Sequence, residues 1–511
     1  MDYKNTPYYS VGRASDLTGK DRFLYRCLEI VPGFLAWFTI LAIFFFSFKA
    51  PFYAAIFIIV FDIYWILKTF YLSFYLRQNW KKVKHNLSLD WKERLSHVKY
   101  DGLYHMILLP FYNESYDIVK KSLDSIFESE YNKKKFIIVV AGEARNKIHA
   151  EEIKLQVEKD FSEKFGHILC TFHPAGVLGE MPGKGSNIAY AAEQTRQLIL
   201  DSNHIPYEDV LVSAFDVDTV VYPQYFECLT WNFLTAEEPL KSSFQPIPVF
   251  NNNIWESPAL SRVVAFSCTF WQMMQQERLD RLTTFSSHSV CFKTLYEVHY
   301  WQKNMVSEDS RIFWNSYLAN DGDYRVVPLC YPVAMDANLA SSFWLTMKNI
   351  YKQQRRWAWG VENFPYIAFG FIKNKKIKTS KKIKNLLIVI EGNWSWSTNP
   401  IMLFLLGWLP VILGGRAFNS TVLSYNLPTF TRVLMTISMT GLFLCAWVAM
   451  SFLPKAPEGS GHWSKVAMLL QWILIPITVT IFGAVPGLDA QTRLMMGQYM
   501  GFWVTPKHRK K

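Results

Sequence analysis

The chain has 511 residues, of which 50% are hydrophobic and 16% are aromatic. This is more apolar material than a single small domain needs, so we expect membrane spans beside a folded domain. The formal net charge is +12, and the basic residues lie beside hydrophobic runs, which favours anionic lipid headgroups and argues against a nucleic-acid partner. Seven scattered cysteines without a CxxC pair indicate neither a disulfide framework nor a zinc site.

Two apolar stretches near the N-terminus, at residues 31–48 and 52–70, each have about the length of a bilayer core. They predict a transmembrane hairpin over residues 31–75, preceded by an N-terminal cytosolic segment at residues 1–30. Basic residues flank the hairpin on both sides, which places the N-terminus and the middle of the chain in the cytoplasm. Because a carboxylate is costly in lipid, we expect Asp62 to face protein, water or a substrate path.

Between residues 100 and 340, short β-rich runs alternate with amphipathic segments. This alternation predicts an α/β domain with a mostly parallel sheet, in which ligands bind at the carboxyl ends of the strands. The strand candidates are residues 105–110, 136–141, 168–172, 210–215 and 326–329.

The C-terminal part of the chain returns to membrane-like composition. Residues 341–397 are aromatic and lysine-rich and predict amphipathic helices at the interface. A C-terminal transmembrane region at 398–486 and an interface segment with a basic tail at 487–511 follow. Three span candidates lie at residues 398–415, 433–453 and 466–485. Five spans would leave the basic tail outside, against the positive-inside rule, so we expect residues 398–415 to be re-entrant or interfacial.

Two aspartates, Asp216 and Asp218, directly follow the fourth strand candidate. Two carboxylates at the end of a strand can share a hard divalent cation, and oxygen ligands of this kind suit Mg²⁺ or Mn²⁺ bridging a diphosphate. An isolated Asp-x-Asp pair is more often a turn or a helix cap, so this motif has meaning only together with others.

Two further loops carry polar side chains suited to a nucleotide. Tyr112 and Glu114 follow the first strand candidate and could bind a base and ribose, the alternative being an ordinary Pro-Asn turn. Lys184 and Asn187 lie in Pro-Gly-Lys-Gly-Ser-Asn before a helical stretch, which suits phosphate or ribose, the alternative being a solvated glycine-rich loop. This loop is not a Walker loop, because its glycine spacing and its last position both differ.

Adjacent carboxylates begin a predicted helix at Ser307-Glu308-Asp309. In the alternative interpretation, Ser307 caps the helix and the acids favour its dipole. As a functional group, Asp309 would be a general base, because a sugar hydroxyl must lose its proton as it attacks an anomeric carbon.

Gln353, Arg356 and Trp357 fall on one side of a helical stretch by their spacing. An arginine there can hold a departing diphosphate, and an indole can stack on a sugar ring. The alternative is a basic helix that faces the membrane.

These motifs, in this order, resemble the membrane-integrated family 2 inverting glycosyltransferases, the group that contains cellulose, hyaluronan and chitin synthases. The resemblance covers nearly the whole chain. It rests on the family's DxD, TED-like and QxxRW motifs, at residues 216–218, 307–309 and 353–357. It implies a GT-A-like nucleotide-diphospho-sugar transferase domain in the cytosol, with transmembrane helices at both ends.

The resemblance also implies roles for single residues. Asp218 and Asp216 would hold the metal, with Asp216 also binding the nucleotide sugar, and Glu308 and Asp309 would be the catalytic pair, with Asp309 as the base. Further substrate contacts would come from Gln353, Arg356 and Trp357, from Glu143 in place of the family's base-reading aspartate, and from Thr505 and Lys507 in a segment similar to the family's FxVTxK gating loop. The polymer synthases continue into more membrane helices after this loop, so we do not expect a complete polysaccharide channel.

The sequence therefore predicts a metal-dependent inverting glycosyltransferase that uses a nucleotide sugar, most simply a UDP-sugar, to build a β-linked polysaccharide at the cell membrane. One alternative is transfer of a single sugar to a lipid acceptor, and another is an inactive transferase-like membrane scaffold. The expected partners are the donor, a saccharide or lipid acceptor and the bilayer. The sugar, the linkage and any protein partner stay open.

Overall fold

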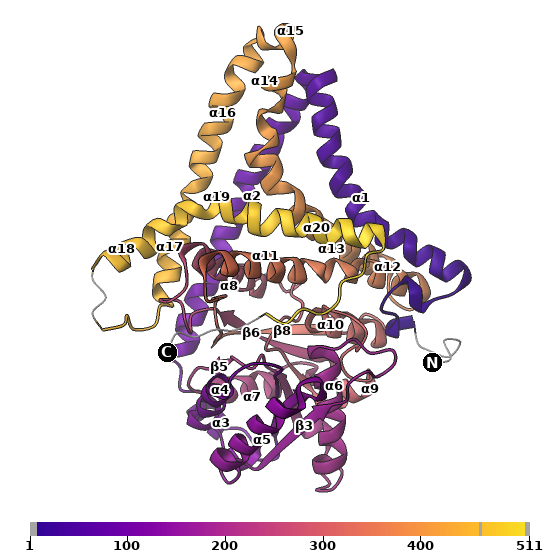
Figure 1. Cartoon of the computed structure of the whole chain (residues 1–511), viewed down its shortest axis with the longest axis vertical. Helices are drawn as coiled ribbons and strands as arrows, with labels where there is room; N and C mark the ends of the chain where they lie inside the picture. The colour runs from indigo at the N-terminus through magenta and orange to yellow at the C-terminus, as the bar shows by residue number, and fades with distance from the viewer. Residues whose placement is uncertain (1–7, 459–461, 506–511) are drawn as a thin grey trace.

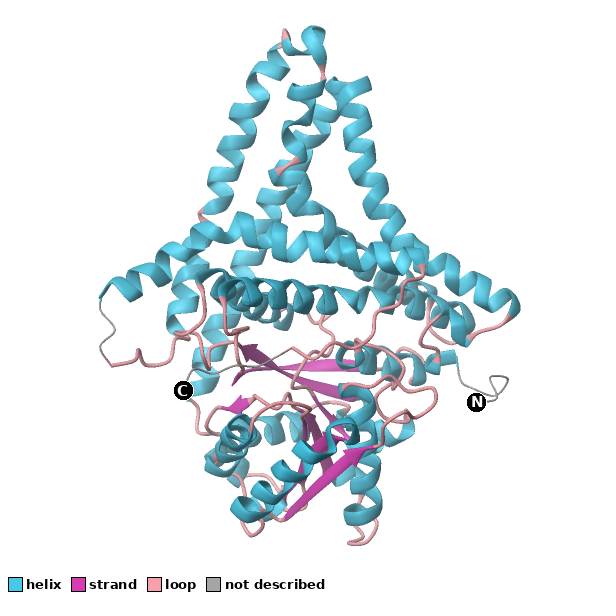
Figure 2. Cartoon of the chain, viewed as in Figure 1, coloured by secondary structure: helices cyan, strands magenta, loops and turns pink. Residues whose placement is uncertain are grey.

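The computed structural model describes residues 8–458 and 462–505. It has three layers, a cone of long helices, a layer of helices lying across the base of this cone, and an α/β domain beneath them (Figure 1). All strands lie in the α/β domain (Figure 2). The chain enters the cone first, builds the α/β domain next, and then returns to the other two layers.

The α/β domain is built on one eight-stranded sheet with the order β3-β2-β1-β4-β7-β6-β8-β5. The strands are β1 Tyr104–Pro110, β2 Phe136–Glu143, β3 His167–His173, β4 Val210–Ala214, β5 Val220–Val221, β6 Ser242–Val249, β7 Ser289–Cys291 and β8 Arg325–Ala334. The first four strands of this order pair in parallel, as predicted. The other half is mixed, because β7 runs antiparallel to β4 and β6, and β5 runs antiparallel to β8.

All five predicted strands are present, whereas β5, β6 and β7 were not predicted. β6 carries Pro246 and Pro248, residues that argue against a strand when the sequence is read alone. β5 has two residues and β7 has three, which is too short for a periodic pattern.

Helices cover both faces of the parallel half. In β1, Ile107 and Leu109 belong to one core and Met106 and Leu108 to the other, because successive strand side chains point to opposite faces. The helices of this domain are α3 Trp91–Ser96, α4 Tyr116–Glu128, α5 Lys147–Phe161, α6 Lys184–Thr195, α7 Tyr225–Thr235, α8 Ala259–Gln276, α9 Phe292–Glu297 and α10 Glu308–Ala319.

The cone begins with a helical hairpin, as predicted. The hairpin turns at Ala50, and Pro51 opens its second helix, where its missing N–H costs nothing. Asp62 is buried and accepts a hydrogen bond of 2.8 Å from Thr431, so it faces protein, as expected. The helices of the cone are α1 Gly19–Lys49, α2 Pro51–Ser88, α14 Leu409–Leu413, α15 Gly415–Asn419 and α16 Val422–Met439. α17 Gly441–Ser451 follows α16 and lies at the base of the cone beside α18 (Figure 1).

The middle layer joins the cone to the α/β domain. Its helices are α11 Phe343–Ala358, α12 Asn363–Lys373, α13 Thr379–Phe404, α18 His462–Leu470, α19 Ile475–Val479 and α20 Val485–Met496. Figure 1 shows α19 and α20 running across the base of the cone above α11.

Among residues 8–458 and 462–505, four helices are long and apolar enough to cross a membrane, and a fifth candidate is the pair Thr379–Phe404 and Leu406–Leu413, bent by 49°. The four are Gly19–Lys49, Pro51–Ser88, Val422–Ser451 and Val466–Met496. The chain is therefore a multi-pass membrane protein. In Figure 1 it reaches the apex of the cone through α14 and α15 and returns through α16.

Candidate active site

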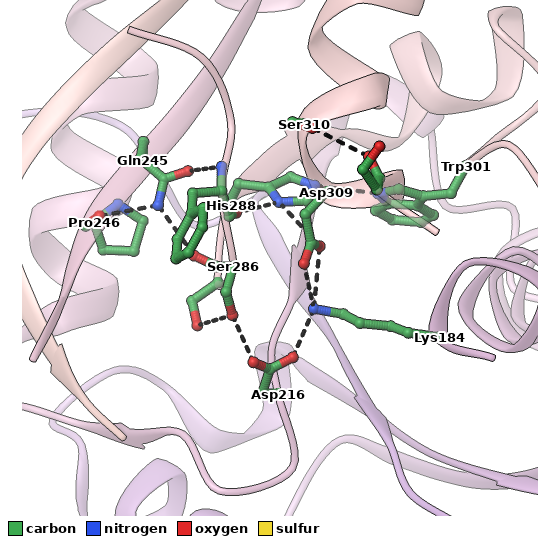
Figure 3. Close-up of polar contacts among 12 residues, drawn as sticks. Lys184, Asp216, Gln245, Pro246, Ser286, His288, Trp301, Asp309 and Ser310 are labelled. Carbon is green, nitrogen blue, oxygen red and sulfur yellow. Dashed lines mark hydrogen bonds and ion pairs between the residues drawn. The ribbon is translucent and has the colours of Figure 1, made fainter. Parts of the chain in front are cut away.

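One lysine joins two of the predicted acidic motifs. Lys184, the first residue of α6, lies 2.7 Å from Asp216 and 3.1 Å from the carboxylate of Asp309 (Figure 3). Its ammonium is buried, which opposes the charge, but the neighbouring carboxylates outweigh this effect and raise the pKa of Lys184. The residue predicted to bind phosphate or ribose thus also holds the predicted base beside the DxD motif.

Two residues of the segment before β7 complete this cluster. Ser286 donates a hydrogen bond of 2.9 Å to Asp216, and the imidazole of His288 lies 3.8 Å from Asp309. Trp301 donates a hydrogen bond to Nε2 of this imidazole, so the imidazole proton is on Nδ1. Nδ1 lies 2.8 Å from the Phe285 carbonyl oxygen, to which it donates. Burial lowers the pKa of His288, so the ring is neutral and lies beside Asp309 without a hydrogen bond to it.

Glu308 is buried beneath the cluster. Burial and then the charge of Asp309 raise the pKa of Glu308 to about 8, so it holds its proton at neutral pH. Its side chain packs on Gly185, where an added Cβ would lie 3.0 Å from the Glu308 Cβ. A side chain at this glycine would push α6 away from α10, and with it Lys184 away from Asp309.

A carboxylate from another element holds the start of α10. Glu362, in the short helix Trp359–Glu362 that follows α11, accepts hydrogen bonds from the Val306 N–H, from the Ser307 N–H and from the Ser307 hydroxyl, the last at 2.7 Å. The Ser307 side chain itself makes no cap bond to α10. The alternative interpretation, in which Ser307 caps α10, does not hold, because the hydroxyl donates to Glu362 instead.

Asp218 lies deeper than Asp216. It is 1% exposed, and its carboxylate accepts a hydrogen bond of 3.0 Å from the Asp336 N–H. Within residues 8–458 and 462–505, no group of three or more His, Cys, Asp or Glu could hold a metal by itself. Two carboxylates fit a divalent cation whose other ligands are diphosphate oxygens and water, so the donor set agrees with Mg²⁺ or Mn²⁺ bound together with a substrate.

A hollow of about 540 Å³, its open mouth included, lies between this cluster and the ends of β1 and β2. Most of the predicted substrate-binding residues line it, namely Tyr112, Glu114, Glu143, Lys184, Asn187, Asp216, Arg356 and Thr505. Glu114 accepts from the Tyr112 and Asn113 N–H groups and closes the predicted turn. Glu143 pairs with Arg145, whose guanidinium lies 4.5 Å from the Tyr112 ring centroid.

The C-terminal segment closes one side of this hollow. Phe502 and Thr505 line it, and the Thr505 hydroxyl is buried without a hydrogen-bond partner in the described part of the chain. Phe502 packs so closely on Gly183 that an added Cβ there would lie 2.5 Å from its ring. Lys507, predicted to act with Thr505, lies outside the described residues.

The QxxRW residues face two different spaces. Arg356 lines the large hollow, where its guanidinium lies 5.0 Å from the Phe502 ring centroid. Gln353 and Trp357 line a second, smaller hollow of about 240 Å³, open mouth included, next to α8. Sequence spacing predicted one common face, but only the fold shows that this face divides between two spaces.

Sequence reasoning missed two parts of the site. Ser286 and Glu362 were not singled out. Neither residue belongs to a recognisable motif, and each reaches the site from an element whose position depends on the tertiary fold.

The sequence model described as "Glycosyl transferase family group 2" matches residues 211–485, more than half of the chain. The chain belongs to this family. Family membership, the sheet and the long apolar helices at both ends confirm the predicted GT-A-like α/β domain with N- and C-terminal membrane helices. The predicted enzyme class, a family 2 glycosyltransferase, is confirmed too.

Curated and solved proteins give further likenesses to this family 2 glycosyltransferase. The chain is 24% identical over 372 residues to poly-β-1,6-N-acetyl-D-glucosamine synthase of Staphylococcus epidermidis, covering 72% of this chain and 77% of that protein. Mannosyltransferase PcManGT from Pyrobaculum calidifontis, solved with GDP-Man and Mn²⁺, matches with 14% identity and a TM-score of 0.40, over 77% of this chain and 99% of that one. S. aureus TarS 1-349, solved with UDP-GlcNAc, matches with 14% identity and a TM-score of 0.36, over 68% of this chain and 91% of that one. These structural scores are too low to carry a conclusion about chemistry.

Proposed function

We propose that this family 2 glycosyltransferase is a metal-dependent inverting enzyme that transfers a sugar from a nucleotide diphosphate donor, a UDP-sugar, onto a growing β-linked polysaccharide at the membrane. The observation that carries the proposal is the bridge from Lys184 to Asp216 and Asp309. It brings the predicted donor-binding carboxylate and the predicted base together at the edge of the hollow that most of the other predicted substrate-binding residues line.

The mechanism is a single in-line displacement. Asp309 takes the proton from an acceptor hydroxyl as that oxygen attacks the anomeric carbon. The bond from the anomeric carbon to the phosphate oxygen breaks, and the nucleoside diphosphate leaves with the bonding electron pair, so the configuration inverts. His288 is neutral and lies 3.8 Å from Asp309, and Glu308 beside it is protonated, so Asp309 is the group placed to accept the proton.

Charge on the departing diphosphate needs positive partners. Lys184 and Arg356 line the hollow and would bind it. Asp216, which also lines the hollow, would hold a divalent cation together with Asp218, which is buried and does not line it. When bound, that cation neutralises charge that develops on the leaving group. Tyr112, Glu114, Glu143 and Asn187 line the rest of the hollow and would bind the base and ribose, and Thr505 would close over the phosphates.

The arrangement of helices supports a catalytic domain on the cytoplasmic face of the cell membrane. If the broken helix α13–α14 crosses, then α1, α2, α13–α14 and α16–α17 give four crossings. Ser10 and Thr505, near the two ends of the described chain, then both lie on the side of the α/β domain. In this arrangement the late segment that does not cross is residues 466–485, which lie across the base of the cone, rather than residues 398–415. The basic tail then lies inside, as the positive-inside rule requires.

The experiment uses the purified full-length chain in lipid vesicles. We expect one donor from a panel of UDP- and GDP-sugars to release nucleoside diphosphate, dependent on Mg²⁺ or Mn²⁺ and abolished by chelation. Asp309→Asn should lower turnover at least 10³-fold, on the scale of losing a general base, while donor binding measured by calorimetry stays within about threefold. Wild-type turnover in this variant would refute the base assignment.

Product length then separates the two forms of the reaction. A ladder or smear on a gel supports a polysaccharide, in agreement with what the name of the S. epidermidis relative says of that protein. A single added sugar on an extracted lipid would instead support the lipid-acceptor alternative. Release of no nucleoside diphosphate from any donor would favour the inactive scaffold.

A further inference from the structure

The segment that follows α20 is held in place by side chains rather than by secondary structure. Residues 497–505, which we call the strap, form no helix or strand and run from the end of α20 down toward the sheet (Figure 1). The strap begins at Gly497, whose φ of +73° ends α20. Its far part, with Phe502, Val504 and Thr505, lines the large hollow proposed to bind the donor, the donor hollow. Such a segment keeps one position only where other elements fix it.

The near end of the strap is fixed to the first helix of the cone. The Tyr499 hydroxyl donates to the Glu29 carboxylate of α1 and lies 2.9 Å from both of its oxygens. Glu29 is 1% exposed and forms an ion pair of 2.7 Å with Arg26, so water does not compete for this carboxylate. Arg26 also donates to the carbonyls of Leu494 and Met495 in the last turn of α20, and thus caps the helix from which the strap leaves.

The short segment before α1 completes this contact. The Ala14 N–H donates to Glu29 at 3.2 Å, and the Arg13 guanidinium lies 5.4 Å from the centroid of the Tyr499 ring, which is within cation–π range. Tyr499 is therefore held at its hydroxyl by α1 and at its ring by the N-terminal segment. Among the described residues, this hydroxyl makes the only side-chain hydrogen bonds of the strap.

The same N-terminal segment contacts the helix of the catalytic base. The buried Arg311 of α10 donates to the Val11 carbonyl at 3.3 Å, and Gln302 donates to the Ser10 carbonyl at 3.2 Å. Arg311 is two residues after Asp309 on α10. The N-terminal segment thus fixes the near end of the strap relative to the base.

The far part of the strap rests on ring contacts with α11. The Arg356 guanidinium lies 5.0 Å from the Phe502 ring centroid, and the Lys352 ammonium lies 5.2 Å from that of Trp503. Cation–π contacts outside a fully buried site are weak. We therefore expect the far part, with the Thr505 hydroxyl, to move away from the donor hollow when the near end is released.

We propose that Glu29 and Tyr499 form a clasp that holds the strap over the donor hollow before the donor binds, so that both are positioning residues for donor binding. A free segment that closes over a ligand loses conformational entropy, and this loss weakens binding. With the clasp formed, the donor meets a strap that is already in place. Neither side chain lines the hollow, so the clasp acts through Phe502 and Thr505. This inference rests on the proposed transferase function and adds residues that prepare its donor site.

Tyr499→Phe tests the clasp, because it removes the hydroxyl and keeps the ring beside Arg13. The matched control is Tyr207→Phe, which removes another tyrosine hydroxyl that donates to a carboxylate, that of Asp201, at 2.7 Å. Tyr207 directly precedes β4, at the opposite end of this strand from Asp216. The control therefore loses the same kind of hydrogen bond at a distance from the strap.

The position of the strap is measured without donor, through a cysteine placed at Thr505. This side chain is 8% exposed, so maleimide should label Thr505→Cys slowly in the full chain in lipid vesicles, as read by mass spectrometry of the C-terminal peptide. Adding Tyr499→Phe should raise the labelling rate on the order of tenfold, the factor expected for losing a hydrogen bond to a charged group. Adding Tyr207→Phe should leave the rate unchanged.

Kinetics with the native Thr505 give the second readout. We expect Tyr499→Phe to raise the KM for the donor on the order of tenfold while kcat stays within about threefold, and Glu29→Gln, which weakens the same bond from the other side, to raise the KM less. Tyr207→Phe should change neither constant.

Two results would overturn the clasp. In one, Tyr499→Phe lowers the melting temperature but leaves the labelling rate and the donor KM unchanged, so that the contact only stabilises the fold. In the other, labelling becomes faster while the donor KM stays the same. Failure of the transferase proposal looks different, because the wild type would release no nucleoside diphosphate from any donor while the difference in labelling would still appear.

Discussion

Glu362 offers the sharpest test of how the catalytic base is held in place. Its carboxylate accepts three hydrogen bonds at the start of α10, from the Val306 and Ser307 N–H groups and from the Ser307 hydroxyl, and a fourth, at 2.8 Å, from the Trp359 indole. Asp309 is two residues further along the same backbone. Glu362→Gln keeps the shape but removes the charge and replaces one acceptor oxygen with a donor.

The magnitude follows from these contacts. Losing a helix cap costs about 1 kcal/mol, and charge-assisted hydrogen bonds are worth about 1.5–3 kcal/mol, so the protein should still fold with a modestly lower melting temperature. A small shift of a catalytic group can cost on the order of 10²-fold in rate. We therefore expect kcat to fall 10- to 100-fold, while the KM for the donor stays within about threefold.

The assay is steady-state release of nucleoside diphosphate in lipid vesicles, with melting followed by fluorescence. The control is Glu193→Gln, because Glu193 also accepts several hydrogen bonds, from Arg196, Gln197 and Tyr300, but lies away from the start of α10. If Glu362→Gln melts at a lower temperature but keeps the wild-type kcat, then the cap only stabilises the fold and the positioning argument is refuted.

Two further predictions concern the C-terminal segment and the pH dependence of stability. Gly183→Ala places a Cβ 2.5 Å from the Phe502 ring, so Phe502 must move and the KM for the donor should rise on the order of tenfold; an unchanged KM would show that this contact does not shape the donor hollow. Burial raises the pKa of Glu227 from 4.5 to about 7. The native state therefore holds this proton more tightly than the unfolded chain, and the contribution of Glu227 to stability is lost as pH rises from about 4.5 to about 7. Glu227→Gln should raise the melting temperature more at pH 8 than at pH 4.5, and an equal change at both would contradict the assignment.

Prediction from the sequence succeeded best where a motif or a hydrophobic period indicates a structure by itself. The apolar runs at residues 31–48 and 52–70 became the hairpin of α1 and α2 because span length is set by the bilayer. The runs in β1, β2 and β4 became central strands, because residues buried on both faces must be apolar throughout. The two acidic motifs and the QxxRW motif, in their order along the chain, identified the glycosyltransferase family to which the chain belongs.

Strands β6 and β7, in the mixed half of the sheet, could not be predicted from the sequence, for a physical reason. β6 accommodates Pro246 because it pairs with β8 through a register shift between Gln245 and Ile247, where the ladder is irregular. β7 has only three residues but lies between β4 and β6 in the sheet order. Neither the shift nor the pairing has a local signature, since both depend on which strands lie alongside.

In the candidate active site, too, some features could be predicted from the sequence and others depend on the tertiary structure. The sequence alone determined which residues carry charge, namely Lys184, Asp216 and Asp309, because a motif fixes residue type and spacing. Only the tertiary structure decided that one ammonium bridges the two carboxylates, that Glu362 caps the base helix, and that Trp357 lines a separate, smaller hollow. These contacts join residues that are far apart in the chain, and their geometry arises from how the layers of helices pack on the sheet rather than from any stretch of sequence.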